Sequence, residues 1–276
     1  MQNHLGEVES NCTSLQIRRK LERIELLRLL LFAGLTSFFI CFPYSAFSQS
    51  PDPLIQKLDS HYYYPSQLGL RSLAARITWL QKDLTASPQK LISHPEVLFS
   101  WNIESDVRIF EVDPRRKGLD ENRKEEIENF FQNYREVILP RSLGQTLSGY
   151  KFIRSQKSPS LITVEYQSLH KQDEVQKYIL EIDTKFWRLF KINIQKKSPP
   201  YRATSKFKYI KKEGQWLVSE TLARFEMGKD SYSEKTSYTY QKTMKFWLPS
   251  KINQVFKKGD DVLHNYQFLI SDHLIK

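Results

Sequence analysis

Histidines and carboxylates are the residues best able to supply metal ligands or acid–base chemistry, so their spacing is the first test for an active site. Beyond residue 48 the histidines are scattered, and none has a second histidine at the spacing that places two ligands on one helix face. We interpret each as a surface or partly buried histidine. They are His61, His94, His170, His264 and His273.

Two clusters of carboxylates are interpreted as solvated groups. Asp260 and Asp261 follow a Lys-Lys-Gly run, which predicts an exposed loop. The glutamates of segment 120–139 lie on the polar face of a predicted amphipathic helix. The sequence also lacks a Gly-x-Ser-x-Gly elbow, a glycine-rich phosphate loop and a His-Glu-x-x-His helix. We therefore expect a non-enzymatic protein with no catalytic residue, no metal site and no cofactor.

The first 48 residues have the composition of an export signal. Basic residues gather between residues 18 and 28, and the stretch 29–42 then carries no charge, like the apolar core of a secretory signal. Ala46 and Ser48 are small residues at positions −3 and −1, so we predict cleavage before Gln49. Because the polar start is long, an uncleaved tether to the inner membrane is the alternative.

The positions of the two cysteines bear on the redox chemistry of the exported chain. Cys12 and Cys41 both lie upstream of the predicted cut, so the exported part would carry neither a thiol nor a disulfide. We predict a signal peptide at 1–48 and a single β-domain at 49–276, located in the periplasm.

The chain is basic, with a formal net charge of +11 from 42 Lys and Arg against 31 Asp and Glu. Lysines recur in almost every predicted strand, so we interpret most of this charge as a solvated outer face. Attraction to anionic lipid or lipopolysaccharide is the alternative. No helix-turn-helix, zinc-finger or RNP-type pattern accompanies the charge, so we expect no nucleic-acid partner. The aromatic fraction of 13% predicts a packed, aromatic-rich core.

Two-residue alternation of apolar side chains predicts a large antiparallel sheet. Segment 174–194 predicts two apolar arms joined by a short polar turn. In the second arm we assign Phe186 and Phe190 to the face that Ile192 and Ile194 occupy. Similar segments recur to the C-terminus and predict about ten or eleven strands in a meander.

Two helices are expected to accompany this sheet. An aspartate and a proline at 52–53 begin a short helix, followed by Leu54, Leu58 and Tyr62 along one face. A longer helix over 120–139 has an apolar stripe and ends before a proline.

Three short segments carry a resemblance to a known family. They read YILEIDTK at 178–185, EGQWLV at 213–218 and KFWLPSKI at 245–252, and a closing strand follows at 266–271. Together with the export signal and the long meander, they resemble outer-membrane lipoprotein-sorting proteins of the LolA/LolB-like superfamily over about residues 53–275. The resemblance implies an α+β, mainly β fold. Its large antiparallel sheet would curve into an incomplete barrel, covered by an N-terminal helix and one inserted amphipathic helix.

The same resemblance implies a function for the concave face of the sheet. We expect a periplasmic, non-enzymatic carrier or binding protein for lipid or lipoprotein acyl chains, with inner- or outer-membrane envelope proteins as further partners. Ordinary core packing is the alternative for each candidate residue of the acyl cavity. The candidates are Leu54, Leu58, Tyr62, Phe99, Trp101, Ile127, Phe130, Phe131, Tyr178, Leu180, Phe190, Tyr238, Tyr240 and Phe246.

Two other functions stay open at this point. One is a structural or envelope-interaction protein whose sheet is filled by its own side chains and binds no ligand. The other is a hydrolase of envelope polymers, because a site assembled only by the fold can leave no motif in the sequence.

Overall fold

The computed structural model describes residues 52–84, 88, 90–115 and 118–276. Every element named below lies in one compact unit, Cys41–Lys276, called the second unit below. The predicted signal peptide and its cleavage site lie outside the described residues, so the division at residue 48 stays a prediction. Among the described residues, no helix is both long and apolar enough to cross a bilayer.

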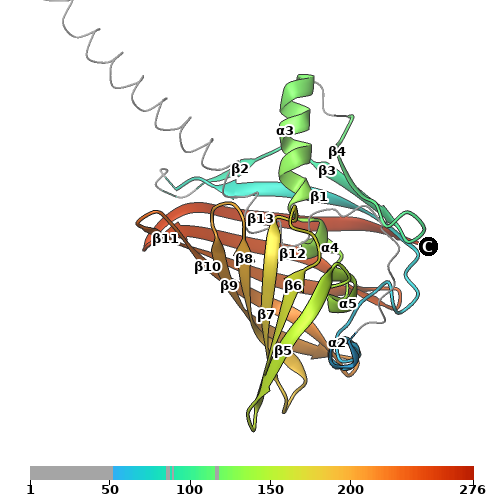
Figure 1. Cartoon of the computed structure of the whole chain (residues 1–276). Helices are drawn as coiled ribbons and strands as arrows, with labels where there is room; N and C mark the ends of the chain where they lie inside the picture. Colours follow the sequence, from blue (N-terminus) through green and yellow to red (C-terminus); the bar gives the residue numbers. More distant parts are fainter. Residues whose placement is uncertain (1–51, 85–87, 89, 116–117) are drawn as a thin grey trace, which may run out of the picture. The chain divides into compact units, whose positions relative to one another are not determined.

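A single antiparallel sheet of 13 strands makes up most of the second unit (Figure 1). The strand order is β4-β3-β1-β13-β12-β11-β10-β9-β8-β7-β6-β5, and the short β2 pairs with β1 beside this path. The strands are β1 (Ser72–Lys82), β2 (Leu91–Ser93), β3 (Val97–Asn102), β4 (Arg108–Val112), β5 (Tyr150–Lys157), β6 (Leu161–Ser168), β7 (Val175–Asp183), β8 (Arg188–Lys196), β9 (Arg202–Lys212), β10 (Gln215–Met227), β11 (Asp230–Thr243), β12 (Phe246–Lys258) and β13 (Asp261–Ile275).

The sheet is open, because its two end strands, β4 and β5, form no ladder with each other in the described part of the chain. From β5 to β13 every strand pairs with its successor along the chain, as in a meander. The strand β1 then closes back on β13. The predicted fold class, a mainly β protein with a large antiparallel sheet that forms an incomplete barrel, is confirmed.

The hairpin predicted at 174–194 is present as β7 and β8, but its second arm differs from the prediction. Ile192 and Ile194 are buried, whereas Phe186 and Phe190 are 42% and 46% exposed. The assignment of these two phenylalanines to the buried face is wrong. A bulge in the β7–β8 pairing lets Leu189 take the buried position, and a slip of one residue moves a side chain to the opposite face.

The helix predicted at the start is α2 (Pro53–Asp59). The Asp52 side chain accepts a hydrogen bond from the Leu54 amide at 2.8 Å and so caps its first turn. Helix α2 ends before Tyr62, which lies in the segment that leads to β1. Leu58 is fully buried on its inner face.

The long helix predicted over 120–139 is two helices, and the single-helix prediction is wrong. Helix α3 (Glu121–Gln132) starts at the Asp120 cap, and α4 (Arg135–Ile138) follows after a break. At the break Tyr134 has φ −99° and ψ 0°, and its hydroxyl donates to Gln254 Oε1 of β12 at 2.6 Å. This tether to the sheet accompanies the change in chain direction.

The apolar stripe of α3 packs on strands β1, β4 and β13 with aromatic contacts. The Phe130 ring stacks on Trp79 with centroids 4.5 Å apart, and Tyr134 contacts Phe268 at 4.7 Å. Phe131 and Tyr134 are each 1% exposed. This end of the sheet is therefore filled by the chain's own side chains.

Candidate functional site

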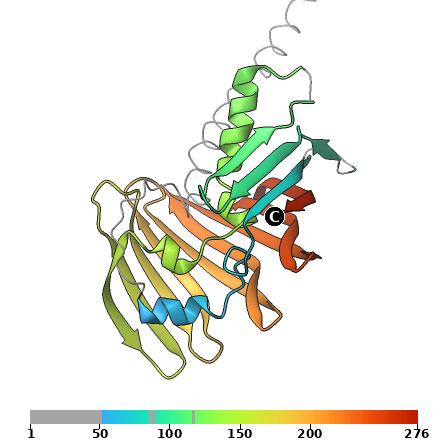
Figure 2. The ribbon, with the colours of Figure 1, turned by 90° about the vertical axis from the view of Figure 1, so that its right-hand side faces the viewer.

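A groove of about 1040 Å³ lies between α2, the short helix α5 (Leu143–Thr146) and strands β5 and β6. Figure 2 shows α2, in blue, lying over the end of the sheet that β5 and β6 form. Because β5 is an edge strand, it has a neighbouring strand on one side only. The groove therefore lies where the open sheet ends.

The groove is lined by both apolar and polar side chains. Phe152 on β5 is 49% exposed, and its ring meets the edge of Tyr166 on β6 at a centroid distance of 6.0 Å. The apolar and aromatic lining residues are Leu54, Ile55, Leu147, Tyr150, Phe152, Ile162 and Tyr166. The polar lining includes Gln56, Ser60, Gln67, Gln145, Ser148, Ser155 and Lys157. Such a mixed lining suits an amphiphile, because it offers apolar side chains to the chain and polar side chains to the head group.

Two carboxylates hold α2 across this groove. At the start of the helix, Asp52 Oδ2 accepts a hydrogen bond from the Tyr166 hydroxyl at 2.7 Å. At its end, the buried Asp59 accepts from the amides of Leu143 and Gly144 at 2.9 and 2.8 Å. Burial raises the pKa of Asp59, and these hydrogen bonds act in the opposite direction. Helix α2 is thereby fastened both to β6 and to α5.

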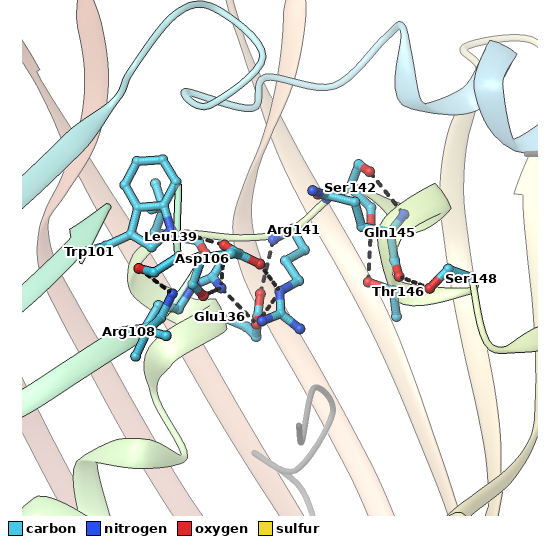
Figure 3. Close-up of polar contacts among 12 residues, drawn as sticks. Trp101, Asp106, Arg108, Glu136, Leu139, Arg141, Ser142, Gln145, Thr146 and Ser148 are labelled. Atoms are coloured by element: carbon cyan, nitrogen blue, oxygen red, sulfur yellow. Dashed lines mark hydrogen bonds and ion pairs between the residues drawn. The ribbon is translucent and has the colours of Figure 1, made fainter. Parts of the chain in front are cut away.

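A buried ion cluster fixes the segment that leads into α5 (Figure 3). Arg108 of β4 pairs with Asp106 at 3.0 Å and reaches Glu136 of α4 at 3.8 Å. Arg141 approaches the same carboxylates at 3.1 Å and 3.5 Å. Burial raises the pKa of Glu136 and lowers that of Arg108, while their mutual attraction opposes both shifts. The next residue, Ser142, caps α5 with a capping box.

A second polar group lies on the sheet under the α3–α4 break. Glu234 of β11 accepts a hydrogen bond from the Thr236 hydroxyl at 3.3 Å and contacts the Gln254 side chain. Gln254 is 1% exposed and also binds the Tyr134 hydroxyl. Burial raises the pKa of Glu234 to about 7. This carboxyl therefore titrates near neutrality.

The titration of Glu234 predicts a pH-dependent stability. The pKa of Glu234 is about 7 in the folded chain against an ordinary value of 4.5 for a glutamate, so the folded state holds this proton more tightly. This proton stabilises the fold fully below pH 4.5, and the stabilisation, about 3 kcal/mol, is lost as the pH rises through 7. Glu234→Gln should remove that loss. Chemical unfolding of both proteins between pH 4.5 and 7 measures this loss of stability. If the free energy of unfolding changes with pH equally in the two proteins, the raised pKa is not that of Glu234.

Of the residues proposed from the sequence for an acyl cavity, the structure brings Leu54 to the groove. Phe190 is exposed on the sheet, and Phe130, Tyr238 and Tyr240 are half-buried. The others are buried side chains of the core, at most 7% exposed. They are Leu58, Tyr62, Phe99, Trp101, Ile127, Phe131, Tyr178, Leu180 and Phe246.

The main wall residues of the groove were missed by the sequence interpretation. Phe152, Ile162 and Tyr166 lie in segments that were predicted as strands, but nothing in their alternation marks β5 as an edge strand. One usable signal is the pair Phe152-Ile153, which places an apolar side chain on each face of one strand. Both are exposed in the structure.

Three histidines contact aromatic rings. His264 stacks between Phe256 and Tyr266, with centroids 6.1 and 5.5 Å away. The His94 ring lies 3.8 Å from Trp79, and His61 stacks on Trp187 at 6.1 Å. Within the described ranges, no three His, Cys, Asp or Glu residues are grouped as a metal ion would require.

Comparison with known proteins returns structures but no sequence relatives. No protein-family model and no curated protein matches the chain. A LolA superfamily protein from Nitrosomonas europaea aligns over 81% of this chain and 92% of its own, at 10% identity and a TM-score of 0.30. A putative outer membrane lipoprotein-sorting domain from Vibrio parahaemolyticus aligns over 81% and 91%, at 8% identity and 0.27.

A DUF1329 family protein from Desulfovibrio piger aligns over 81% of this chain and 90% of its own, at 6% identity and a TM-score of 0.26. We infer nothing about the function of this chain from proteins at these identities and TM-scores. Two of these structures are described as a LolA superfamily protein and an outer membrane lipoprotein-sorting domain, the family that the three sequence segments resemble.

Proposed function

We propose that this chain is a non-enzymatic envelope protein of the periplasm that binds or carries the acyl chains of a lipid or lipoprotein, and that the groove beneath α2 is its binding site. The observation that carries the proposal is the exposure of Phe152. A large aromatic side chain lies half uncovered in a groove of about 1040 Å³, next to Ile162 and Tyr166. A bound chain would remove that surface from water.

The energetics of such binding follow from burial of apolar surface. Each methylene group transferred from water to the groove wall contributes about 0.8 kcal/mol, so several methylenes are needed for useful affinity. The polar lining residues include Gln56, Gln145 and Ser148, which supply hydrogen-bonding groups for the head group. Lys157 lines the groove together with the carboxylates Asp52 and Asp59, so the charge of the lining does not select the charge of the head group.

The aromatic packing under α3 favours a second candidate function. Phe130, Phe131 and Tyr134 pack on Trp79 and Phe268 without help from a ligand. A protein with only this core would be a structural or envelope-interaction protein. It differs from the first candidate in predicting no saturable uptake of an amphiphile.

Uptake of a fluorescent fatty acid by the purified protein tests the proposal. We expect saturable binding, and we expect Phe152→Glu to raise the dissociation constant by at least about tenfold, because a charge replaces an apolar side chain that the ligand would bury. The matched control is Ile153→Glu, which introduces the same charge at a 38% exposed neighbour that does not line the groove. Equal effects of the two substitutions, or no uptake by the unsubstituted protein, would contradict the proposal.

A further inference from the structure

Three hairpin turns at one end of the sheet carry aromatic and basic residues. The turns join β7 to β8, β9 to β10 and β11 to β12, and alternate turns of an antiparallel meander lie at the same end. We call this surface the aromatic–lysine rim. It consists of Lys57, Lys185, Phe186, Trp187, Arg188, Lys211, Lys212, Trp216, Lys242, Met244, Lys245 and Trp247.

Direct contacts between the turns place them side by side. The Trp216 indole N–H donates to the Phe186 carbonyl at 3.0 Å, which joins the first turn to the second. The Lys212 ammonium lies 4.2 Å from the centre of the Trp247 ring, which joins the second turn to the third. Lys57 of α2 lies 3.7 Å from the Trp187 ring. These contacts make the rim one continuous surface that extends to α2, the helix that borders the groove.

Two apolar members of the rim are exposed to solvent. Met244 is 77% exposed and Phe186 is 42% exposed, each in a turn. The three tryptophans of the rim are half-buried. The remaining tryptophans, Trp79 and Trp101, are buried in the core. A change in the surroundings of the rim therefore changes the emission of its three tryptophans, while the emission of the two core tryptophans stays the same.

Positive charge dominates the same surface. Seven of its members are lysine or arginine, and the two carboxylates within the turns are Asp183 and Glu213. Asp183 pairs with Arg188 at 3.3 Å, and Glu213 pairs with Lys242 at 2.6 Å. The other five basic side chains of the rim are not balanced by a carboxylate within these turns, so the surface carries a net positive charge.

We infer that the aromatic–lysine rim docks on the surface of a bilayer that contains anionic lipid. Tryptophan is enriched at the level of the lipid head groups, where its ring is partly apolar and its N–H is wet. Lysine side chains bury their methylenes there and keep their charge in water. The net charge of +11 acts in the same direction. Cation–π interactions alone are the competing explanation of the rim. They account for the packing of lysines on tryptophans, but they do not account for the exposure of Met244 and Phe186 on the same surface.

Flotation with lipid vesicles tests this inference. We expect the protein to float with vesicles of equal parts phosphatidylcholine and phosphatidylglycerol and to stay behind with phosphatidylcholine alone. Tryptophan emission should shift to the blue on binding. Lys185→Glu/Lys211→Glu/Lys245→Glu, with one exposed lysine from each turn, should lower the partition coefficient by about 100-fold. Met244→Ser should weaken binding with no change in charge.

A matched triple variant separates the rim from total charge. Lys171→Glu/Lys197→Glu/Lys229→Glu reverses three exposed lysines in the turns at the opposite end of the sheet, so its net charge equals that of the rim variant. Both variants carry the same residues 1–51, whose contribution to vesicle binding is then the same. We expect the control to keep most of the binding. The inference would be overturned if the two variants lost binding equally, or if the protein floated equally with neutral vesicles. It would also be overturned if the protein did not float at all, which is the result expected of a rim that binds an acidic protein.

This test is independent of the groove. Phe152→Glu should float like the unsubstituted protein, because Phe152 lies on β5 and outside the rim. If the protein binds vesicles but takes up no fatty acid, the proposed function is wrong and the inference about the rim stands. If it takes up fatty acid but does not bind vesicles, only the inference about the rim is wrong.

Discussion

Replacement of Phe131 by alanine is expected to lower the free energy of unfolding by about 3–5 kcal/mol and to leave amphiphile uptake by the folded protein unchanged. The side chain is 1% exposed and contacts Phe110, Trp79 and Phe268 at centroid distances of 5.6–5.7 Å. Its removal leaves a cavity that these rings cannot fill without moving. Chemical denaturation gives the stability, and the fluorescent fatty acid gives the uptake.

The expected split between stability and uptake follows from where the two phenylalanines lie. Phe131 belongs to the packed end of the sheet, while Phe152 lines the groove. Phe152→Ala, at a 49% exposed position, should change stability little and weaken uptake. If Phe131→Ala weakens uptake under conditions where the variant is fully folded, the ligand lies beneath α3 and the assignment of the groove is wrong.

Truncation of Glu136 to alanine should cost about 3 kcal/mol of stability. The carboxylate is 2% exposed and faces the 3% exposed side chain of Arg108 at 3.8 Å. Without Glu136, this buried guanidinium keeps Asp106 and the Leu139 carbonyl as partners but loses one of its two negative neighbours. A buried charge that loses a partner is strongly destabilising, because the desolvation cost remains. Denaturant unfolding measures the change.

A double variant separates loss of the ion pair from loss of packing. Arg108→Leu/Glu136→Leu removes both charges and keeps apolar bulk at each position, so it should cost less than Glu136→Ala alone. A double variant that is much less stable than the single variant would contradict this interpretation of the cluster. Because Arg141 also contacts Glu136 and precedes the Ser142 cap, we expect both variants to loosen α5.

Alternation of side chains was sufficient to predict most of the sheet. The hairpin predicted at 174–194 is present as β7 and β8. The error at Phe190 arose from a β-bulge, which inserts one residue without leaving a mark in the apolar pattern. The break at Tyr134 has a similar cause, since it accompanies a hydrogen bond to Gln254, 120 residues away along the chain.

The groove could not be predicted because it depends on long-range order. A sequence pattern shows that β5 and β6 are strands, but only the topology makes β5 an edge and brings α2 beside it. Asp59 likewise reads as an ordinary helical carboxylate, yet it binds amides 84 and 85 residues later. Leu54 was identified because its local helical spacing is enough to place it on the inner side of α2.

Native mass spectrometry of the protein purified from its own envelope tests the binding of an acyl chain most directly. We expect the unsubstituted protein to retain a molecule whose mass and fragments identify an acyl chain, and Phe152→Glu to appear mainly as the bare chain. The same spectrum gives the mass of the chain and thus the predicted cut before Gln49. An unsubstituted protein that appears only at its bare mass, with no retained lipid, would contradict acyl-chain binding in the groove.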